Sequence, residues 1–168
     1  MADINQADPK FMDFTFTGLD HGINSIKDGS GPLIPFVMAS LNGEKKLSRF
    51  VADSYEDSMM NASEHIMHLN PVPDYALLAF DGFITMEGEK YDAIMVQAYD
   101  KTLDEGFVFA QRYIPKNDNQ EFESIGNAAF IGKEQNLLTI PSANDKPKDL
   151  KTENPTINKG NKPWWKIW

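Results

Sequence analysis

The first helical pattern in the chain lies over residues 17–27. Leu19, Ile23 and Ile26 fall on one face of such a helix, and the Thr17 hydroxyl can cap its first turn. The segment 28–32, which contains two glycines and a proline, ends the pattern. Residues 1–12 precede it, and we expect them to form a flexible N-terminal arm.

A β-hairpin is predicted next. The apolar run 33–41 leads into Asn42-Gly43, a residue pair that accepts the positive φ angles of a tight type I′ turn. Residues 44–51 then return as the second strand. Pro35 has no amide hydrogen, which favours an edge position or a late start for the first strand.

The clearest local pattern predicts a second helix over residues 54–69. Asp53 and Glu56 have the spacing of a capping box, and Asn70-Pro71 ends the helix. One apolar stripe at helical spacing runs along it and consists of Tyr55, Met59, Ala62, Ile66 and Leu69.

Four strand-like runs follow, over residues 75–86, 91–99, 107–114 and 122–131. Short connections join them, and such connections suit antiparallel neighbours because a parallel pair needs a crossover of about a dozen residues. The element order is α-β-β-α-β-β-β-β. It predicts a single α+β domain over residues 13–140, with a mainly antiparallel sheet and both helices packed on one face.

The late strands are non-polar on both faces, whereas a sheet with one solvated face alternates between apolar and polar residues. If both helices cover one face, the other is left with aromatic residues and glutamines, which is typical of interaction surfaces. The candidate contact residues there are Tyr99, Phe109 and Tyr113. A second copy of the chain, a ligand or the C-terminal segment can cover this face. We expect the protein to be a homodimer.

The composition changes after residue 140. Residues 141–168 contain four prolines and many Lys and Asn residues, and all three tryptophans of the chain lie in its last five positions. We expect an extended basic tail whose terminal peptide docks on a protein surface. Its contact residues are Trp164, Trp165, Lys166 and Trp168. Membrane contact is a less favoured alternative, because six residues offer little amphipathic surface.

Charge is unevenly distributed along the chain. The formal net charge is −9, but residues 13–145 hold 9 basic and 21 acidic groups, a net −12, and residues 146–168 carry a net +4. An acidic body repels phosphate backbones, which argues against nucleic-acid binding and favours basic partners.

The chain contains no cysteine, which excludes disulfides, thiol catalysis and iron–sulfur clusters. No apolar run approaches the ~18 residues of a bilayer-spanning helix, and the N-terminus lacks the features of a signal peptide. These features predict a soluble cytoplasmic protein.

We find no motif for a catalytic nucleophile, a phosphate-binding loop, a dinucleotide site or a zinc peptidase. Neither a metal nor a cofactor is expected, because His65 and His68 fit boundary and surface positions of the second helix. Arg112 lies in a predicted strand, where it can clamp an anion or pair with a cross-strand carboxylate.

The sequence therefore favours a non-enzymatic protein-interaction or adaptor module. One alternative is a small-molecule-binding domain or an enzyme that uses Arg112 and strand carboxylates. The carboxylates that the strands offer are Asp81, Asp92 and Asp100. A second alternative is peripheral membrane association through the tryptophan-containing tail.

Overall fold

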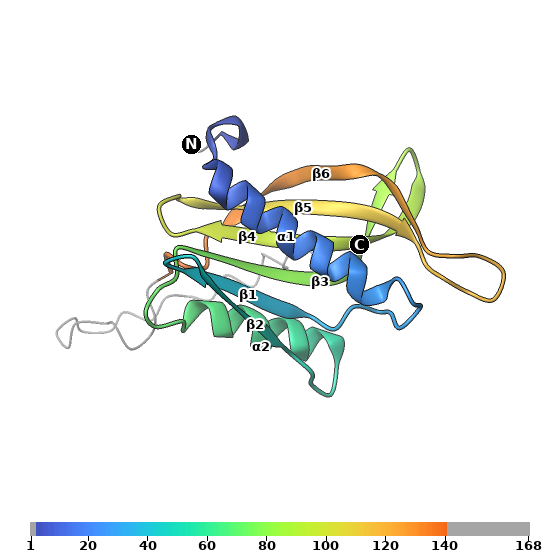
Figure 1. Cartoon of the computed structure of the whole chain (residues 1–168), viewed down its shortest axis with the longest axis horizontal. Helices are drawn as coiled ribbons and strands as arrows, with labels where there is room; N and C mark the ends of the chain where they lie inside the picture. The colour runs from blue at the N-terminus through green and yellow to red at the C-terminus, as the bar shows by residue number, and fades with distance from the viewer. Residues whose placement is uncertain (1–2, 141–168) are drawn as a thin grey trace, which may run out of the picture.

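The structure, a computed structural model, describes residues 3–140. Its elements are, in chain order, the 3-10 turn η1 (Ile4–Gln6), α1 (Pro9–Ile26), β1 (Phe36–Leu41), β2 (Glu44–Arg49), α2 (Tyr55–Met67), β3 (Tyr75–Met86), β4 (Glu89–Asp100), β5 (Glu105–Ile114) and β6 (Glu123–Gln135). The strands form one antiparallel sheet in the order β2-β1-β3-β4-β5-β6 (Figure 1). The α+β class and the predicted element order are confirmed.

The predicted hairpin forms as expected. Asn42 and Gly43 adopt φ angles of 52° and 83°, and Leu41 pairs with Glu44 across the turn. β1 starts at Phe36, directly after Pro35, and lies between β2 and β3. Of the two explanations for Pro35, the late start is therefore confirmed.

α1 begins at Pro9 rather than near Thr17. The Asp8 carboxylate caps it by accepting a hydrogen bond from the Lys10 amide at 2.9 Å, and Phe11 is fully buried. Residues 9–12, which we expected in the N-terminal arm, thus belong to the helix. The apolar stripe is hidden in the sequence because it continues through Gly18, where a Cβ atom would collide with a side chain of β3.

The cap of α2 is also displaced from its predicted position. Ser54, not Asp53, is the N-cap residue, and its hydroxyl accepts a hydrogen bond from the Asp57 amide at 3.0 Å. The Asp57 carboxylate accepts the Ser54 hydroxyl proton in return, at 2.8 Å. The capping arrangement is therefore shifted by one residue along the chain.

The two helices lie on opposite faces of the sheet, and the prediction that both pack on one face is wrong. Leu77 and Ala79 of β3 belong to the apolar cluster under α1, whereas Leu78 and Phe80 belong to the cluster under α2. α1 packs on β3 and β4, and in Figure 1 it crosses the front of the sheet. A sheet covered on both sides is apolar at successive positions, which explains the non-polar strands.

In the part of the chain that the structure describes, neither helix has the length and apolar character needed to cross a lipid bilayer.

Candidate functional site

A cavity of about 500 Å³ opens beside the C-terminal end of α1, on the α1 side of the sheet. Its volume lies in the ~300–1,000 Å³ range of typical ligand sites. The wall is built from the loop after α1, the first residue of α2, the middle of β3, the start of β4 and the end of β5. The lining residues with polar or aromatic side chains are Tyr55, Asp81, Phe83, Asp92, Tyr113 and Lys116.

Two donors hold the Asp81 carboxylate in place. The Tyr113 hydroxyl donates to Oδ1 at 2.8 Å and to Oδ2 at 3.0 Å, and the Leu33 amide donates to Oδ2 at 2.9 Å. These donors come from β5 and from the segment before β1, so tertiary contacts orient the carboxylate at the cavity wall.

Tyr55 provides a second link at the same point. Its hydroxyl accepts a hydrogen bond from the Asp81 amide at 2.7 Å and donates one to the Leu33 carbonyl at 3.0 Å. These two hydrogen bonds connect the start of α2 to β3 and to the segment that precedes β1. In the sequence Tyr55 belongs to the apolar stripe of α2, which gives no indication of this role.

The half-buried position of Asp81 affects its ionisation. Burial raises the pKa of the Asp81 carboxyl above its ordinary value, and the nearby Asp92 carboxylate acts in the same direction. The hydrogen bonds from Leu33 and Tyr113 lower the pKa but do not cancel these effects. Burial, followed by the charge of Asp81, also raises the pKa of Tyr113. Tyr113 is therefore a neutral hydrogen-bond donor at physiological pH.

Asp92 brings a second carboxylate to the cavity from the neighbouring strand. It is the cross-strand neighbour of both Phe83 and Tyr113. Phe83 is 46% exposed, and the Lys90 ammonium lies 3.9 Å from the centre of its ring. Lys116, which also lines the cavity, forms an ion pair with Glu121 at 3.2 Å. The carboxylates of Asp81 and Asp92 thus lie beside aromatic rings, and the ring of Phe83 already contacts a cation, the Lys90 ammonium.

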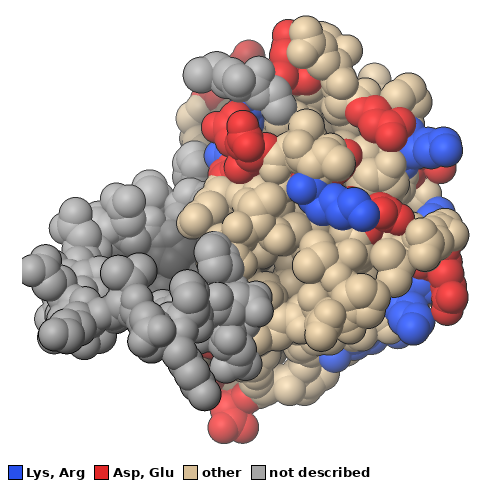
Figure 2. Space-filling view, turned by 90° about the vertical axis from the view of Figure 1, so that its left-hand side faces the viewer, with Lys and Arg blue, Asp and Glu red and all other residues tan. Residues whose placement is uncertain are grey.

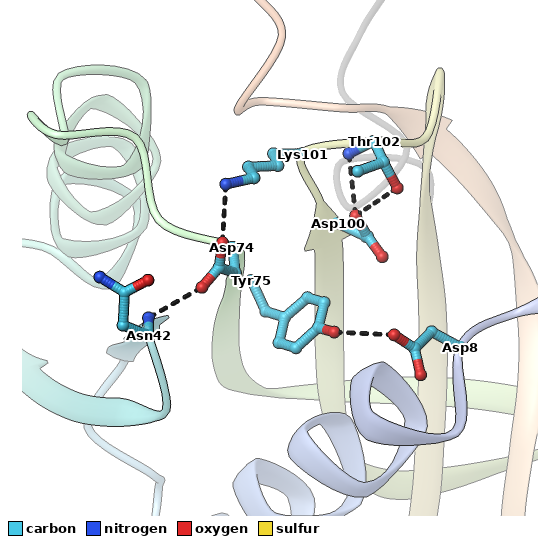
Figure 3. Close-up of polar contacts among 7 residues, drawn as sticks. All are labelled: Asp8, Asn42, Asp74, Tyr75, Asp100, Lys101 and Thr102. Carbon is cyan, nitrogen blue, oxygen red and sulfur yellow. Dashed lines mark hydrogen bonds and ion pairs between the residues drawn. The ribbon is translucent and has the colours of Figure 1, made fainter.

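A second polar site lies at the other end of α1 (Figure 3). Asp74 accepts hydrogen bonds from the Lys101 ammonium at 2.6 Å and from the Asn42 amide at 2.8 Å, and these contacts lower the pKa of Asp74. The Tyr75 hydroxyl donates to Asp8 at 3.0 Å. These bonds connect the β1–β2 turn, the start of β3, the β4–β5 turn and the start of α1.

The surface around this second site contains two open hollows of about 600 and 290 Å³. Figure 2 shows this end of the molecule, where acidic and basic side chains are interspersed with uncharged residues. Contacts with neighbouring groups lower the pKa of both Asp8 and Asp74, whereas burial raises that of Asp81. We therefore assign this second site a role in stability.

The strand residues predicted to form one contact surface are separated by the fold. Tyr113 lines the cavity, and Phe109 is buried under α1, with its ring 5.6 Å from that of Phe16. Tyr99 lies on the α2 side, where its hydroxyl donates to Glu134. Phe109 pairs with Val96 of β4, and Val96 and Tyr99 point to opposite faces because they are three residues apart. The three aromatic residues therefore do not form one face.

Arg112 does not line the cavity and lies on the α2 side with its guanidinium 4.9 Å from the Tyr91 ring centre. Of the three strand carboxylates, Asp81 and Asp92 meet at the cavity and Asp100 lies at the far end of β4. In the sequence, Asp81 interrupts an otherwise apolar strand, and this is a signal that could have pointed to the site. The predicted contact residues Trp164, Trp165, Lys166 and Trp168 lie outside the described residues.

Among residues 3–140, we find no group of three or more histidine or acidic side chains placed to hold a metal ion. The His65 ring packs against Phe50, and His68 forms a hydrogen bond with the Glu64 carbonyl.

No protein-family model, curated protein sequence or solved structure matches this chain. Function is therefore inferred from the geometry and chemistry of the site.

Proposed function

We propose that this protein is a non-enzymatic interaction module and that the Asp81 cavity binds a basic side chain presented by a partner protein. The observation that carries this proposal is the convergence of Asp81 and Asp92, from two adjacent strands, on a cavity lined by aromatic rings. Carboxylates accept charge-assisted hydrogen bonds from ammonium and guanidinium groups, and aromatic faces attract cations.

Two further observations support a cationic ligand. The Lys90 ammonium rests on the Phe83 ring, so this ring has a face suited to a cation. The net charge of −12 over residues 13–145 attracts basic partners over a longer range and raises their association rate.

The position of Arg112 favours this function over the alternative in which Arg112 and strand carboxylates act on one substrate. Arg112 lies on the opposite face of the sheet from Asp81 and Asp92, because neighbouring positions of β5 point to opposite sides. The cation at the cavity wall, Lys116, is paired with Glu121. The charged residues that line the cavity are two carboxylates and one lysine, so the lining favours a positive group.

Self-association and a cytoplasmic location remain predictions. Multi-angle light scattering at micromolar concentration measures the first directly. A monomeric mass would count against the expected homodimer, unless the C-terminal segment of the same chain covers the sheet face.

The proposal is tested with a lysine analogue, Nα-acetyl-lysine N′-methylamide, and its Nε-acetylated form as the uncharged control. We expect the charged probe to shift the backbone amide NMR signals of Asp81, Phe83 and Asp92 at millimolar concentration. The acetylated form has lost its charge, and we expect it to bind at least about tenfold more weakly, since a hydrogen bond to a charged group contributes roughly 1.5–3 kcal/mol.

Two charge-matched variants locate the binding site. Asp92→Asn removes a carboxylate of β4 that lines the cavity. Asp20→Asn removes an exposed carboxylate of α1 that does not line it. We expect the first to weaken binding of the probe and the second to leave it unchanged. Equal binding of both probe forms, or equal effects of the two substitutions, would contradict the proposal.

A further inference from the structure

The cavity beside the C-terminal end of α1 offers a cation both negative charge and aromatic surface. The carboxylates of Asp81 and Asp92 lie in its wall, and the aromatic side chains of the wall belong to Tyr55, Phe83 and Tyr113. Tyr55 is 38% exposed and Phe83 is 46% exposed, so part of each side chain is open to a ligand. Aromatic faces attract cations, and methylated ammonium groups are bound in this way. Which form of cation fits then depends on the hydrogen-bond acceptors that the wall still offers.

Three of the four lining side chains that carry an acceptor oxygen already take part in hydrogen bonds. The Tyr55 hydroxyl accepts a hydrogen bond from the Asp81 amide at 2.7 Å and donates one to the Leu33 carbonyl at 3.0 Å. The Tyr113 hydroxyl and the Leu33 amide donate to the Asp81 carboxylate. These bonds leave the Asp92 carboxylate as the main side-chain acceptor for a ligand.

A primary ammonium group is poorly matched to such a wall. It carries three N–H donors, and each of them needs an acceptor once water has been removed. Methylation replaces these donors with methyl groups and keeps the positive charge. The methyl groups gain apolar contacts, because the wall also contains Ile26, Pro32 and Pro115. A methylated ammonium group thus keeps its attraction to both carboxylates while it requires fewer hydrogen bonds.

We propose that the basic side chain bound in the Asp81 cavity is a methylated lysine of the partner protein. This inference rests on the proposed function and specifies its ligand, with Asp81 and Asp92 supplying negative charge and Phe83 supplying aromatic surface. The Lys90 ammonium already lies 3.9 Å from the centre of the Phe83 ring, which shows that a cation fits against this ring. The cavity volume of about 500 Å³ accommodates the bulkier head group.

The test compares matched ligands by NMR titration of the full-length chain, with the backbone amide signals of Asp81, Phe83 and Asp92 as reporters. The first ligand is Nα-acetyl-trimethyllysine N′-methylamide, and the second is the same probe without the methyl groups on its side-chain nitrogen. In the third, a carbon atom replaces the quaternary nitrogen, which keeps the shape and removes the charge. We expect the trimethylated probe to bind at least about fivefold more tightly than either of the others, because it alone combines charge with methyl groups.

Two aromatic substitutions locate the contact. Phe83→Leu removes a ring of the cavity wall, and Phe130→Leu removes a 40% exposed ring of β6 that does not line the cavity. We expect the first to weaken binding of the trimethylated probe several-fold and the second to leave its binding unchanged. Thermal unfolding followed by circular dichroism confirms that both variants are folded.

The ligand series separates failure of this inference from failure of the proposed function. Equal or tighter binding of the unmodified lysine probe would overturn the inference and leave the proposed function intact, whereas no binding of either charged probe would contradict both. Equal binding of the uncharged analogue would show that the cavity selects apolar surface alone.

Two further results would also overturn the inference. Choline carries the same trimethylated head group without the lysine chain, and tighter binding of choline than of the trimethylated probe would assign the cavity to a small molecule. Equal effects of Phe83→Leu and Phe130→Leu would place the bound probe outside the cavity.

Discussion

A tyrosine–aspartate hydrogen bond lies near each end of α1, and the two aspartates have opposite properties. Near the N-terminus, the Tyr75 hydroxyl donates to Asp8 at 3.0 Å, and the pKa of Asp8 is lowered by hydrogen bonds from the Lys10 amide and from Tyr75 (Figure 3). Near the C-terminus, Tyr113 donates to Asp81 at 2.8 Å, yet the pKa of Asp81 is raised.

The difference comes from solvation. Asp8 is exposed, so its charged form keeps its water while gaining two hydrogen bonds and the favourable field of a helix N-terminus. Asp81 is half-buried, and the cost of removing its charge from water exceeds what its hydrogen bonds return. Perturbed carboxylates in cavities are typical of functional sites, whereas the Asp8 arrangement is a helix cap.

The largest effect is expected from Tyr113→Phe, which breaks the pair at Asp81. The substitution removes the hydroxyl donor from a half-buried carboxylate, so we expect the free energy of unfolding to fall by about 1–3 kcal/mol. Urea denaturation monitored by circular dichroism measures this loss. A change of less than a few tenths of a kcal/mol would indicate that water replaces the hydroxyl.

The pH dependence of stability at Asp81 is expected to have an unusual sign. Between the ordinary pKa of 3.8 and the raised value, the folded state holds more protons at Asp81 than the unfolded state does. Asp81 therefore makes stability fall as pH rises through this window. In Asp81→Asn this contribution disappears. Urea unfolding curves recorded from pH 3 to pH 8 give the free energy of unfolding at each pH, and its slope against pH is compared between the variant and the wild type. An identical slope in both proteins would contradict the raised pKa.

Asp8→Ala tests the opposite pH dependence, because the pKa of Asp8 is lowered. We expect it to change the free energy of unfolding less than the substitutions at the cavity do. The lowered pKa of Asp8 means that the charged carboxylate contributes stability above its ordinary pKa, and that this contribution is lost as pH falls through the lowered value. The variant also lacks the N-cap of α1. We expect a reduced melting temperature at pH 7 and a difference from wild type that shrinks in acid. A difference independent of pH would show that the charge plays no part.

Tyr75→Phe is expected to have the smallest effect. The Asp8 carboxylate remains exposed to water, which replaces the lost hydrogen bond, and the Tyr75 ring retains its packing against Phe11 and Phe14. Urea denaturation should show a loss clearly smaller than that of Tyr113→Phe. Equal losses would remove the distinction between an exposed cap and a half-buried site.

Local patterns in the sequence were sufficient to predict those elements whose characteristic residues lie close together along the chain. Asn42-Gly43 predicted the hairpin turn, and the stripe from Tyr55 to Ile66 predicted α2 because these residues repeat at helical spacing. The start of α1 was missed because its stripe passes through Gly18, which has no side chain to mark the buried face.

The candidate site was predictable only in part, because its residues come from separate elements. Asp81 and Asp92 were two of the three carboxylates predicted in or beside strands, and the sequence did not separate them from Asp100. The role of Tyr55 depends on the start of α2 reaching β3, which no local pattern reveals. The grouping of Tyr99 with Phe109 failed because a one-residue difference in strand register moves a side chain to the other face.

By itself, the sequence determined which segments become helices and strands, apart from the start of α1. It also determined that the sheet is mainly antiparallel and that both faces of the central strands are apolar. These properties follow from periodicity and connection length, which are local. Only the tertiary structure decided that the helices occupy opposite faces, that Asp81 and Asp92 share a cavity and that Arg112 lies away from it. Those outcomes depend on strand register and helix placement, since burial and proximity are properties of the assembled sheet and of no single segment.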